Sequence, residues 1–320
     1  MPRIPGWFPL LLCLLSSCVD RSPVFRATAT AEIARQPGDY LNGTARAWQV
    51  SRGGVSRGLL WGTLHLSYGS NTQMPGPIRA RFYAAADLTV EAVLDEAPDA
   101  MHAIYDASRK ANLAADRAAL QRLDPATRAA LDQVPGADMG TLSVRGAASL
   151  LAMAAARPYD AAALPENDVV DLNLILFARA QDRPVHGLET PGTVDPTLAD
   201  PNGPEAAAVF RRLVRQKDDR EEFTRWLRTT YGQGDVATAV AGLAAWEADA
   251  GDLRLNDRTR DALYTRRNAA WLPQLEARFG EPGDHFVAVG AGHLLGPDGL
   301  VALLRARGYQ VTPCVHDVCS

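Results

Sequence analysis

Two histidines stand in matching positions near the two ends of the chain, each three residues after a glycine that closes an apolar run. The first motif is Gly62-Thr63-Leu64-His65, and the second is Gly290-Ala291-Gly292-His293. Glycine lets the backbone turn sharply, so a histidine that follows a buried strand in this way is expected to turn its imidazole inward. Imidazole nitrogens bind divalent metal ions and exchange protons near neutral pH, and both chemistries are therefore candidates here.

Two carboxylates follow predicted strands in the same manner. Glu91 ends the run Leu88-Thr89-Val90, and Glu189 ends Val185-His186-Gly187-Leu188. In α/β sheets ligands bind at the carboxyl ends of the strands, where loops direct side chains into a shared crevice. Two imidazoles and one or two carboxylates that converge there would form a divalent-metal site.

Each of these residues also has a purely structural interpretation. A histidine at a strand end is often only hydrogen-bonded, and Glu91 or Glu189 could cap a helix or pair with one of the many arginines. The segment 290–296 also fits the spacing Gly-x-Gly-x-x-x-Gly of a dinucleotide-binding turn, although that turn normally belongs to the first βαβ unit of a larger fold. The sequence contains no His-Glu-x-x-His or Walker-type motif.

The elements that must position these residues are strands at both ends of the chain and helices between them. Turn residues at 52–54 separate two apolar runs and predict a β-hairpin, while the last 35 residues or so predict a strand, a helix and a strand. We therefore expect an α/β fold, with a mixed β-sheet built from the N- and C-terminal segments and a helical cap from the middle of the chain. Residues 44–320 would form a single domain, with the cap at about 100–180 and 204–280.

The N-terminal segment is typical of an exported protein. Residues 1–17 combine an arginine, a short apolar run and small residues, as a signal peptide does, and the run is too short to span a bilayer. Leu15-Ser16-Ser17-Cys18 resembles a lipobox, so we expect Cys18 to carry lipid and residues 18–43 to form a flexible tether; an ordinary cleaved signal is the alternative. Val19 favours sorting to the outer membrane, with the protein facing the periplasm.

The tail contains two cysteines five residues apart, Cys314 and Cys319. In an oxidising compartment these are expected to form a disulfide that fixes the terminus. A metal site formed by the two cysteines with His316 is the alternative.

The composition excludes one class of partner. The 320 residues include 33 Lys and Arg and 37 Asp and Glu, and the formal net charge is −4. The chain has no excess of basic residues of the kind that would indicate a nucleic-acid partner. The sequence predicts no particular oligomeric state.

At these motifs the chain resembles the TraB/GumN family, which is related to the Tiki metalloproteases. The resemblance implies a metal-dependent hydrolase fold in which His65, Glu91 and His293 hold the metal. It places Glu189 and the pair Arg267-Asn268 as groups that orient the ligands or the substrate. Thr89 departs from the apolar run that usually precedes the glutamate. The matching segments are 60–66, 87–91, 185–190, 267–268 with Trp271, and 287–296 with 299–300 and 308–309.

The expected reaction is hydrolysis of a peptide or similar acyl bond by metal-activated water, with manganese, cobalt or zinc as the ion. Glu91, if it is not a ligand, or Glu189 otherwise would take the proton, and Arg267 or Asn268 would stabilise the oxyanion. The alternative function is a non-catalytic envelope lipoprotein that binds a protein or polysaccharide partner. The presence of the complete set His65, Glu91 and His293 favours the enzyme.

Overall fold

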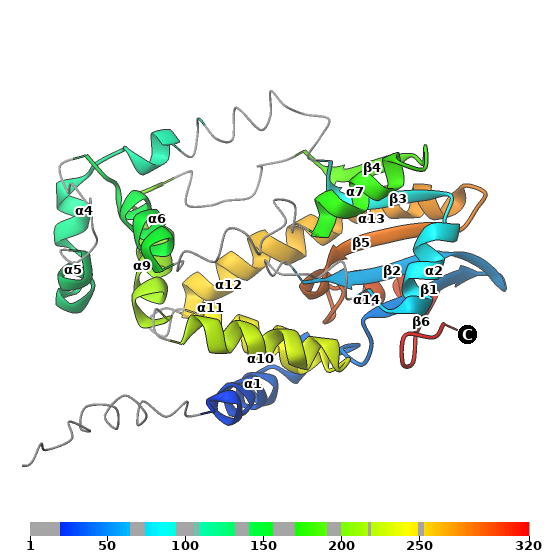
Figure 1. The fold of residues 1–320 in the computed structure, drawn as a ribbon, viewed down its shortest axis with the longest axis horizontal. Coiled ribbons are helices and arrows are strands. Elements are labelled where there is room, and N and C mark those ends of the chain that lie inside the picture. Colours follow the sequence, from blue (N-terminus) through cyan, green and yellow to red (C-terminus); the bar gives the residue numbers. More distant parts are fainter. Residues whose placement is uncertain are drawn as a thin grey trace, which may run out of the picture.

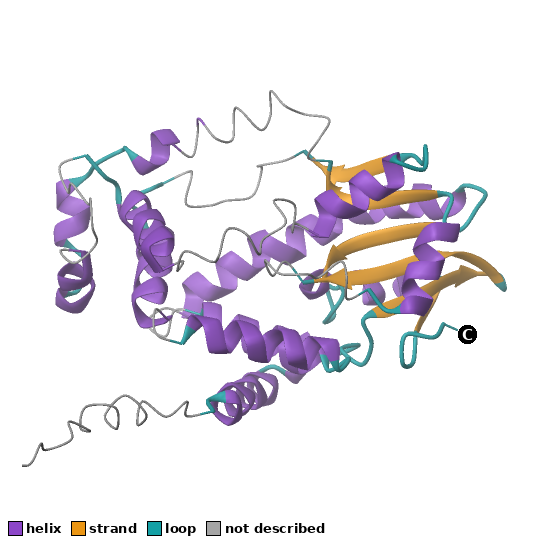
Figure 2. Cartoon of the chain, in the orientation of Figure 1, coloured by secondary structure: helices purple, strands orange, loops and turns teal. Residues whose placement is uncertain are grey.

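The computed structural model contains one mixed sheet with helices on both faces (Figures 1 and 2). It describes residues 20–64, 74–93, 106, 109–131, 141–155, 170–190, 200–216, 219–248 and 253–319. The six strands of the sheet lie in the order β4-β3-β5-β2-β1-β6, so the predicted α/β fold is confirmed. The strands are β1 (Ala47–Arg52), β2 (Val55–Thr63), β3 (Asp87–Ala92), β4 (Val185–Glu189), β5 (His285–Gly290) and β6 (Gln310–Pro313).

Four neighbouring strands run in the same direction. β2 and β3 each pair in parallel with β5, and β3 pairs in parallel with β4. β1 forms the predicted hairpin with β2 and lies antiparallel to β6 at the other edge. The carboxyl ends of β2, β3, β4 and β5 therefore meet at one edge of the sheet, which is the arrangement that the candidate site requires.

Alternation of side chains along the strands divides the core between the two faces of the sheet. On one face, Leu88 and Phe286 pack against α2 and α7. On the other, Val287 packs with Trp271 and Leu275 of α13, with α14 and with helices from the middle of the chain.

The helices are α1 (Ser22–Arg35), η1 (Pro37–Tyr40), α2 (Gly76–Ala84), α4 (Arg117–Gln121), α5 (Pro125–Leu131), α6 (Val144–Ala155), α7 (Val170–Arg179), α9 (Pro204–Gln216), α10 (Arg220–Gly232), α11 (Val236–Glu247), α12 (Leu253–Arg260), the π-turn η2 (Asp261–Thr265), α13 (Arg266–Gly280), η3 (Ala291–His293) and α14 (Leu300–Ala306).

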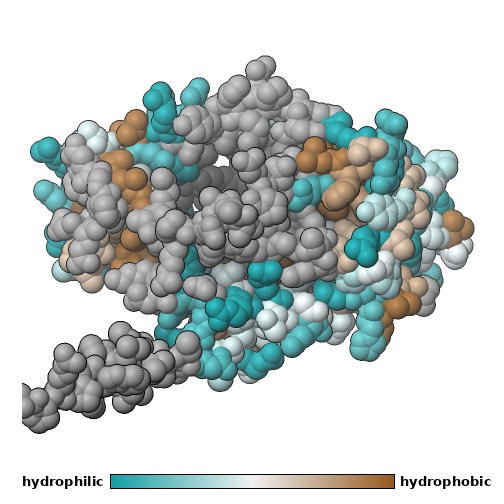
Figure 3. Space-filling model, viewed as in Figure 1, coloured by the Kyte–Doolittle hydropathy of each residue, from teal (hydrophilic) through white to brown (hydrophobic). Residues whose placement is uncertain are grey.

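The helical cap is smaller than the sequence predicted. α4, α6 and α9 share a separate apolar cluster and, with α5, lie away from the sheet (Figure 1). The predicted ranges 100–180 and 204–280 both extend too far, because α7 and α13 pack directly on the sheet. Their buried apolar stripes face strands, which a helical period alone does not reveal. Apolar side chains also reach the surface at α7, where Leu176 and Phe177 are exposed (Figure 3).

The prediction of a flexible tether over 18–43 is wrong for most of its length. α1 packs along α11 and α10, and its Phe25 ring lies 5.3 Å from Phe223 and 5.9 Å from Trp246. Aromatic contacts of this kind contribute about 0.5–1.5 kcal/mol each, so packing stabilises a helix whose apolar residues do not gather on one face. Within the described ranges no helix combines the length and the apolar composition needed to cross a bilayer.

Candidate active site

The parallel register brings the predicted strand-end residues together. Thr63 pairs with Gly290, and Ala92 pairs with Glu189, so all four strands end at nearly the same level. Glu91 lies one residue before the end of β3, and His293 lies in the turn η3 that follows β5. His65 lies outside the described residues. We call the group Glu91, Glu189, Arg267, Asn268 and His293 the carboxyl-edge cluster.

Arg267 joins the two glutamates of this cluster. Its Nε and Nη2 atoms donate to the two oxygens of Glu189 at 2.9 and 2.6 Å, and Nη2 also donates to Glu91 Oε2 at 2.6 Å. Trp271 stacks under the guanidinium at 4.6 Å and donates its indole N–H to Glu189 at 3.2 Å. Burial alone would lower the pKa of Arg267, but the hydrogen bonds and charges of Glu189 and Glu91 outweigh it and raise the pKa. Arg267 is therefore a permanently charged cation between two carboxylates.

Asn268 sets the tautomer of His293. Both residues are buried, and the Asn268 amide Nδ2 donates to the carbonyl groups of His293 at 3.1 Å and Asp298 at 2.8 Å. These two acceptors fix the orientation of the amide, so its Oδ1, 2.7 Å from His293 Nδ1, accepts the Nδ1–H. His293 Nε2 then carries a lone pair, as a metal ligand or a proton acceptor requires.

This geometry changes the role predicted for Asn268. Both N–H groups of its amide are bonded to backbone carbonyls. It has no donor left for a substrate oxyanion, so the prediction that Asn268 stabilises an oxyanion does not fit. Asn268 orients His293, and Arg267 is the candidate for the oxyanion.

His293 Nε2 and Glu91 face each other across the site. Nε2 lies 3.7 Å from Glu91 Oε1, which also accepts the backbone N–H of Gly290 at 2.7 Å. Two ligands at about 2.1 Å from one tetrahedral ion lie about 3.4 Å apart, so this pair has a spacing suitable for two metal ligands. The nitrogen and oxygen donors also suit manganese, cobalt or zinc.

Arg267 contacts the same lone pair, that of His293 Nε2. Its Nη1 is 3.1 Å from His293 Nε2, which is too close for an ion to occupy that position at the same time. An ion on His293 and Glu91 would require the guanidinium to withdraw, and its paired hydrogen bonds to Glu189 could hold it in the withdrawn position. Among the described residues no group of three His, Cys, Asp or Glu side chains is arranged to hold a metal.

Tyr264 also contacts His293, although no sequence motif indicated it. Its ring lies 5.0 Å from the His293 ring in an edge contact, while Trp271 lies 4.4 Å from it. Burial, with the charges of Glu247 and Glu91, raises the pKa of Tyr264 to about 12, so the phenol keeps its proton. The spacing 264, 267, 268, 271 follows one helix face and was the available signal.

The segment after β5 does not have the form of a dinucleotide-binding turn. Such a turn leads directly into a helix whose N-terminus faces the phosphates. Here residues 291–293 form a short 3₁₀ turn with His293 buried, and α14 begins only at Leu300.

A second polar cluster lies at the opposite, amino edge of the same sheet face. His285 Nδ1 lies 3.0 Å from both oxygens of Asp87, and its Nε2 lies 3.4 Å from the Glu281 carbonyl. Arg278 and His186 approach the same aspartate at 3.4 and 3.6 Å. We call Asp87, His186, Arg278 and His285 the amino-edge cluster.

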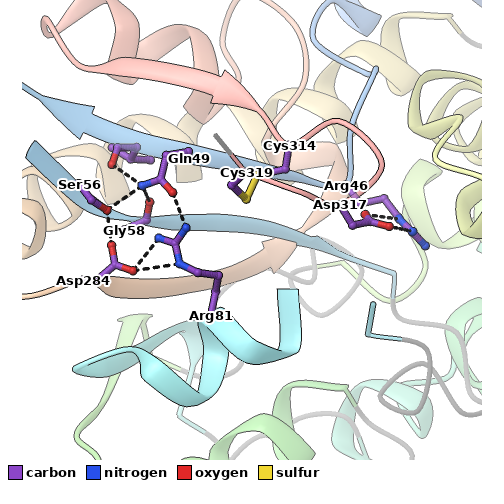
Figure 4. Close-up of a disulfide and its surroundings, with 10 residues drawn as sticks. Arg46, Gln49, Ser56, Gly58, Arg81, Asp284, Cys314, Asp317 and Cys319 are labelled. Atoms are coloured by element: carbon purple, nitrogen blue, oxygen red, sulfur yellow. Dashed lines mark hydrogen bonds and ion pairs between the residues drawn. A yellow bond between two sulfur atoms is a disulfide. The ribbon is translucent and has the colours of Figure 1, made fainter. Parts of the chain in front are cut away.

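Figure 4 shows the disulfide of the tail and its surroundings. The sulfur atoms of Cys314 and Cys319 are bonded to each other, as the disulfide interpretation expects. Asp317, inside the loop that they close, forms an ion pair with Arg46. Further along the strands, Arg81 bridges Gln49 and Asp284, joining α2 to the hairpin. Cys18 lies outside the described residues.

The comparisons with known proteins agree with the motifs. A family model described as the TraB/PrgY/gumN family matches residues 47–313. No curated protein and no solved structure gives a significant match. The matched range contains every residue of the carboxyl-edge cluster.

Proposed function

Because the chain belongs to the TraB/PrgY/gumN family, we propose that it is a metal-dependent hydrolase that cleaves a peptide or similar acyl bond. One observation carries the proposal. The Asn268 amide holds His293 in the tautomer whose Nε2 lone pair faces Glu91 at 3.7 Å, beside the guanidinium of Arg267. Withdrawal of the guanidinium would leave this Nε2 lone pair to a metal ion or a proton.

His293 and Glu91 would hold the ion, with His65 as the third ligand suggested by the sequence. A divalent ion supplies Lewis acidity, which polarises a carbonyl group and makes water more acidic. Glu91 would bind the ion through Oε1, and Oε2, which the withdrawn guanidinium would release, would take the proton of the attacking water. Both oxygens of Glu189 already accept hydrogen bonds from Arg267, so Glu189 acts by orienting that side chain. Arg267 then stabilises the negative charge that develops on the carbonyl oxygen.

Metal content and hydrolysis test the proposal together. Protein purified without chelators should contain close to one equivalent of manganese, cobalt or zinc by elemental analysis, and it should cleave fluorescein-labelled casein. His293→Ala should lose both properties with little change in folding. His316→Gln, which alters an exposed histidine in the tail, is the matched control and should retain both. A wild-type protein that neither binds metal nor cleaves the probe would contradict the proposal and favour a binding protein.

We also propose that the protein is held in the cell envelope by lipid on Cys18, facing the periplasm at the outer membrane. The lipobox-like residues before Cys18 support this assignment. Cys18→Ser should release the protein into the soluble fraction after cell lysis, because a single lipid-bearing cysteine is the only anchor that the sequence suggests. A variant that still sediments with membranes would contradict the anchor and leave the hydrolase proposal untouched.

A further inference from the structure

A π-helical turn precedes the residues of α13 that build the site. It covers Asp261–Thr265, between α12 and α13. π-turns are rare and often occur at functional sites, because the extra residue changes which side chains face inward. Tyr264 lies in this turn, and the carbonyl of its neighbour Leu263 accepts a hydrogen bond from Arg267 at 3.1 Å. The turn and the arginine are thus joined to each other.

The phenol end of Tyr264 lies over the glycine that precedes His293. A Cβ atom placed on Gly292 would lie 2.7 Å from Tyr264 Cε1 and 3.0 Å from its hydroxyl oxygen. A larger residue at this position would therefore force the Tyr264 ring to shift. Gly292 therefore does more than shape a turn, since it makes room for the Tyr264 hydroxyl beside the imidazole.

The Tyr264 hydroxyl makes no hydrogen bond with any described residue, whereas two other tyrosine hydroxyls are used in the fold. Tyr40 donates to Glu32 at 3.0 Å, and Tyr231 donates to the carbonyl of Gly62 at the end of β2. Tyr264 is only half-buried, so a hydroxyl without a protein partner next to His293 is available to a bound molecule. A bound substrate would provide the missing acceptor.

We infer that Tyr264 is a further catalytic residue, which donates its hydroxyl hydrogen to the carbonyl oxygen of the substrate as that oxygen gains charge. The inference rests on the proposed function. In the step, the water oxygen bonds to the carbonyl carbon and the carbonyl π pair moves onto the oxygen. Glu91 takes the proton of the water and passes it to the leaving nitrogen as the carbon–nitrogen bond breaks. Tyr264 keeps its own proton throughout and acts beside Arg267 as a second donor.

Tyr264→Phe tests this role, because it removes one oxygen and keeps the ring contacts with His293 and Gly292. The expected result is a loss of roughly 10²-fold or more in kcat, the effect of removing an oxyanion donor, with KM nearly unchanged. Metal content and the thermal unfolding midpoint should equal those of the wild type. Tyr83→Phe, on the other face of the sheet where the ring is 47% exposed, is the matched control and should retain full activity. Labelled casein and p-nitrophenyl acetate are the two probes, and both should show the same loss.

Three results would overturn the inference, and they can be told apart. Full activity of Tyr264→Phe in a protein whose wild type is active would reject the role of the hydroxyl alone. A lower unfolding midpoint of this variant would show that the hydroxyl has a structural partner. A metal-free wild type inactive on both probes would reject the proposed function, and the role of Tyr264 with it.

Discussion

The two ends of α13 each bring an arginine to a histidine and a carboxylate of the same sheet face, yet the two groups differ in how their hydrogen bonds are arranged. In the amino-edge cluster, both ring nitrogens of His285 face acceptors, Asp87 and the Glu281 carbonyl. In the carboxyl-edge cluster, Nδ1 of His293 faces an acceptor, while Nε2 faces the donor Arg267. In the carboxyl-edge cluster the lone pair on His293 Nε2 therefore faces a donor, and a lone pair on a fixed nitrogen is what metal binding or base catalysis would use.

This contrast shows that residue types alone do not identify a site. Both clusters contain a histidine, an acidic side chain and an arginine, all largely buried. The difference comes from one amide, Asn268, and from the position of Glu91 and Glu189 at the carboxyl ends of β3 and β4. The amino-edge cluster places acceptors at both nitrogens of its histidine, whereas the carboxyl-edge cluster places an acceptor at one and a donor at the other.

The largest expected effect is on stability, at the amino edge. Asp87→Ala should lower the free energy of unfolding by about 3–5 kcal/mol, because it leaves His285 and Arg278 without their buried acceptor. Glu91→Ala should cost less, since Arg267 keeps its paired contact with Glu189. Urea denaturation of the two variants measures both values. Equal losses would contradict the distinction between a structural and a reactive cluster.

The next effect concerns Asn268 and metal binding. Asn268→Ala should weaken the affinity for manganese or zinc by roughly 10–100-fold, because His293 loses the partner that fixes its tautomer. ¹⁵N NMR of the metal-free wild type should show His293 protonated at Nδ1, and the variant should show a mixture of tautomers. Gln274→Ala, which removes another α13 amide bonded to a backbone carbonyl, should leave the affinity unchanged. An unchanged affinity in Asn268→Ala would remove the basis for the tautomer argument.

A smaller effect, of opposite sign, is expected at Arg267. Arg267→Met should strengthen metal binding by about tenfold or more, because it removes a positive charge beside both ligands. The same variant should lose hydrolysis, since the oxyanion donor is gone. Calorimetric titration compares it with Arg278→Met at the other end of α13, which should bind metal as the wild type does. Weaker binding in Arg267→Met would show that the guanidinium supports the ion and does not compete with it.

The smallest effect is the pH dependence of the amino-edge cluster. Burial and the charge of Arg278 lower the pKa of His186 from its usual value of 6.5, so the unfolded chain binds this proton more readily than the folded one. Stability from this group is present above pH 6.5 and is lost as the pH falls below it. Unfolding free energies at pH 7.5 and 5.5 should differ less in His186→Gln than in the wild type. The same pH slope in both proteins would exclude His186 as the source.

The sequence predicted the carboxyl-edge cluster better than the amino-edge cluster. Glu91, Glu189 and His293 each follow an apolar run, so a parallel sheet was enough to place them together. The pairing of Asp87 with His285 depends on strand register, which no local pattern specifies. Tyr264 shares a helix face with Arg267 and Trp271 but belongs to no motif, and α1 was missed because its apolar residues do not gather on one face, with only Phe25 and Ala29 buried.

The docking of α1 has a consequence for where the protein can act. With lipid on Cys18, only Val19, Asp20 and Arg21 would separate the anchored residue from α1, and three residues span at most about 10 Å. A flexible segment over 18–43 would instead have a mean reach of about 28 Å. The volume that the folded body could explore is therefore small, and its substrates would have to come within a narrow layer above the lipid headgroups. In such a layer, encounters between the protein and its substrates would depend more on lateral diffusion in the membrane than on the motion of a flexible linker.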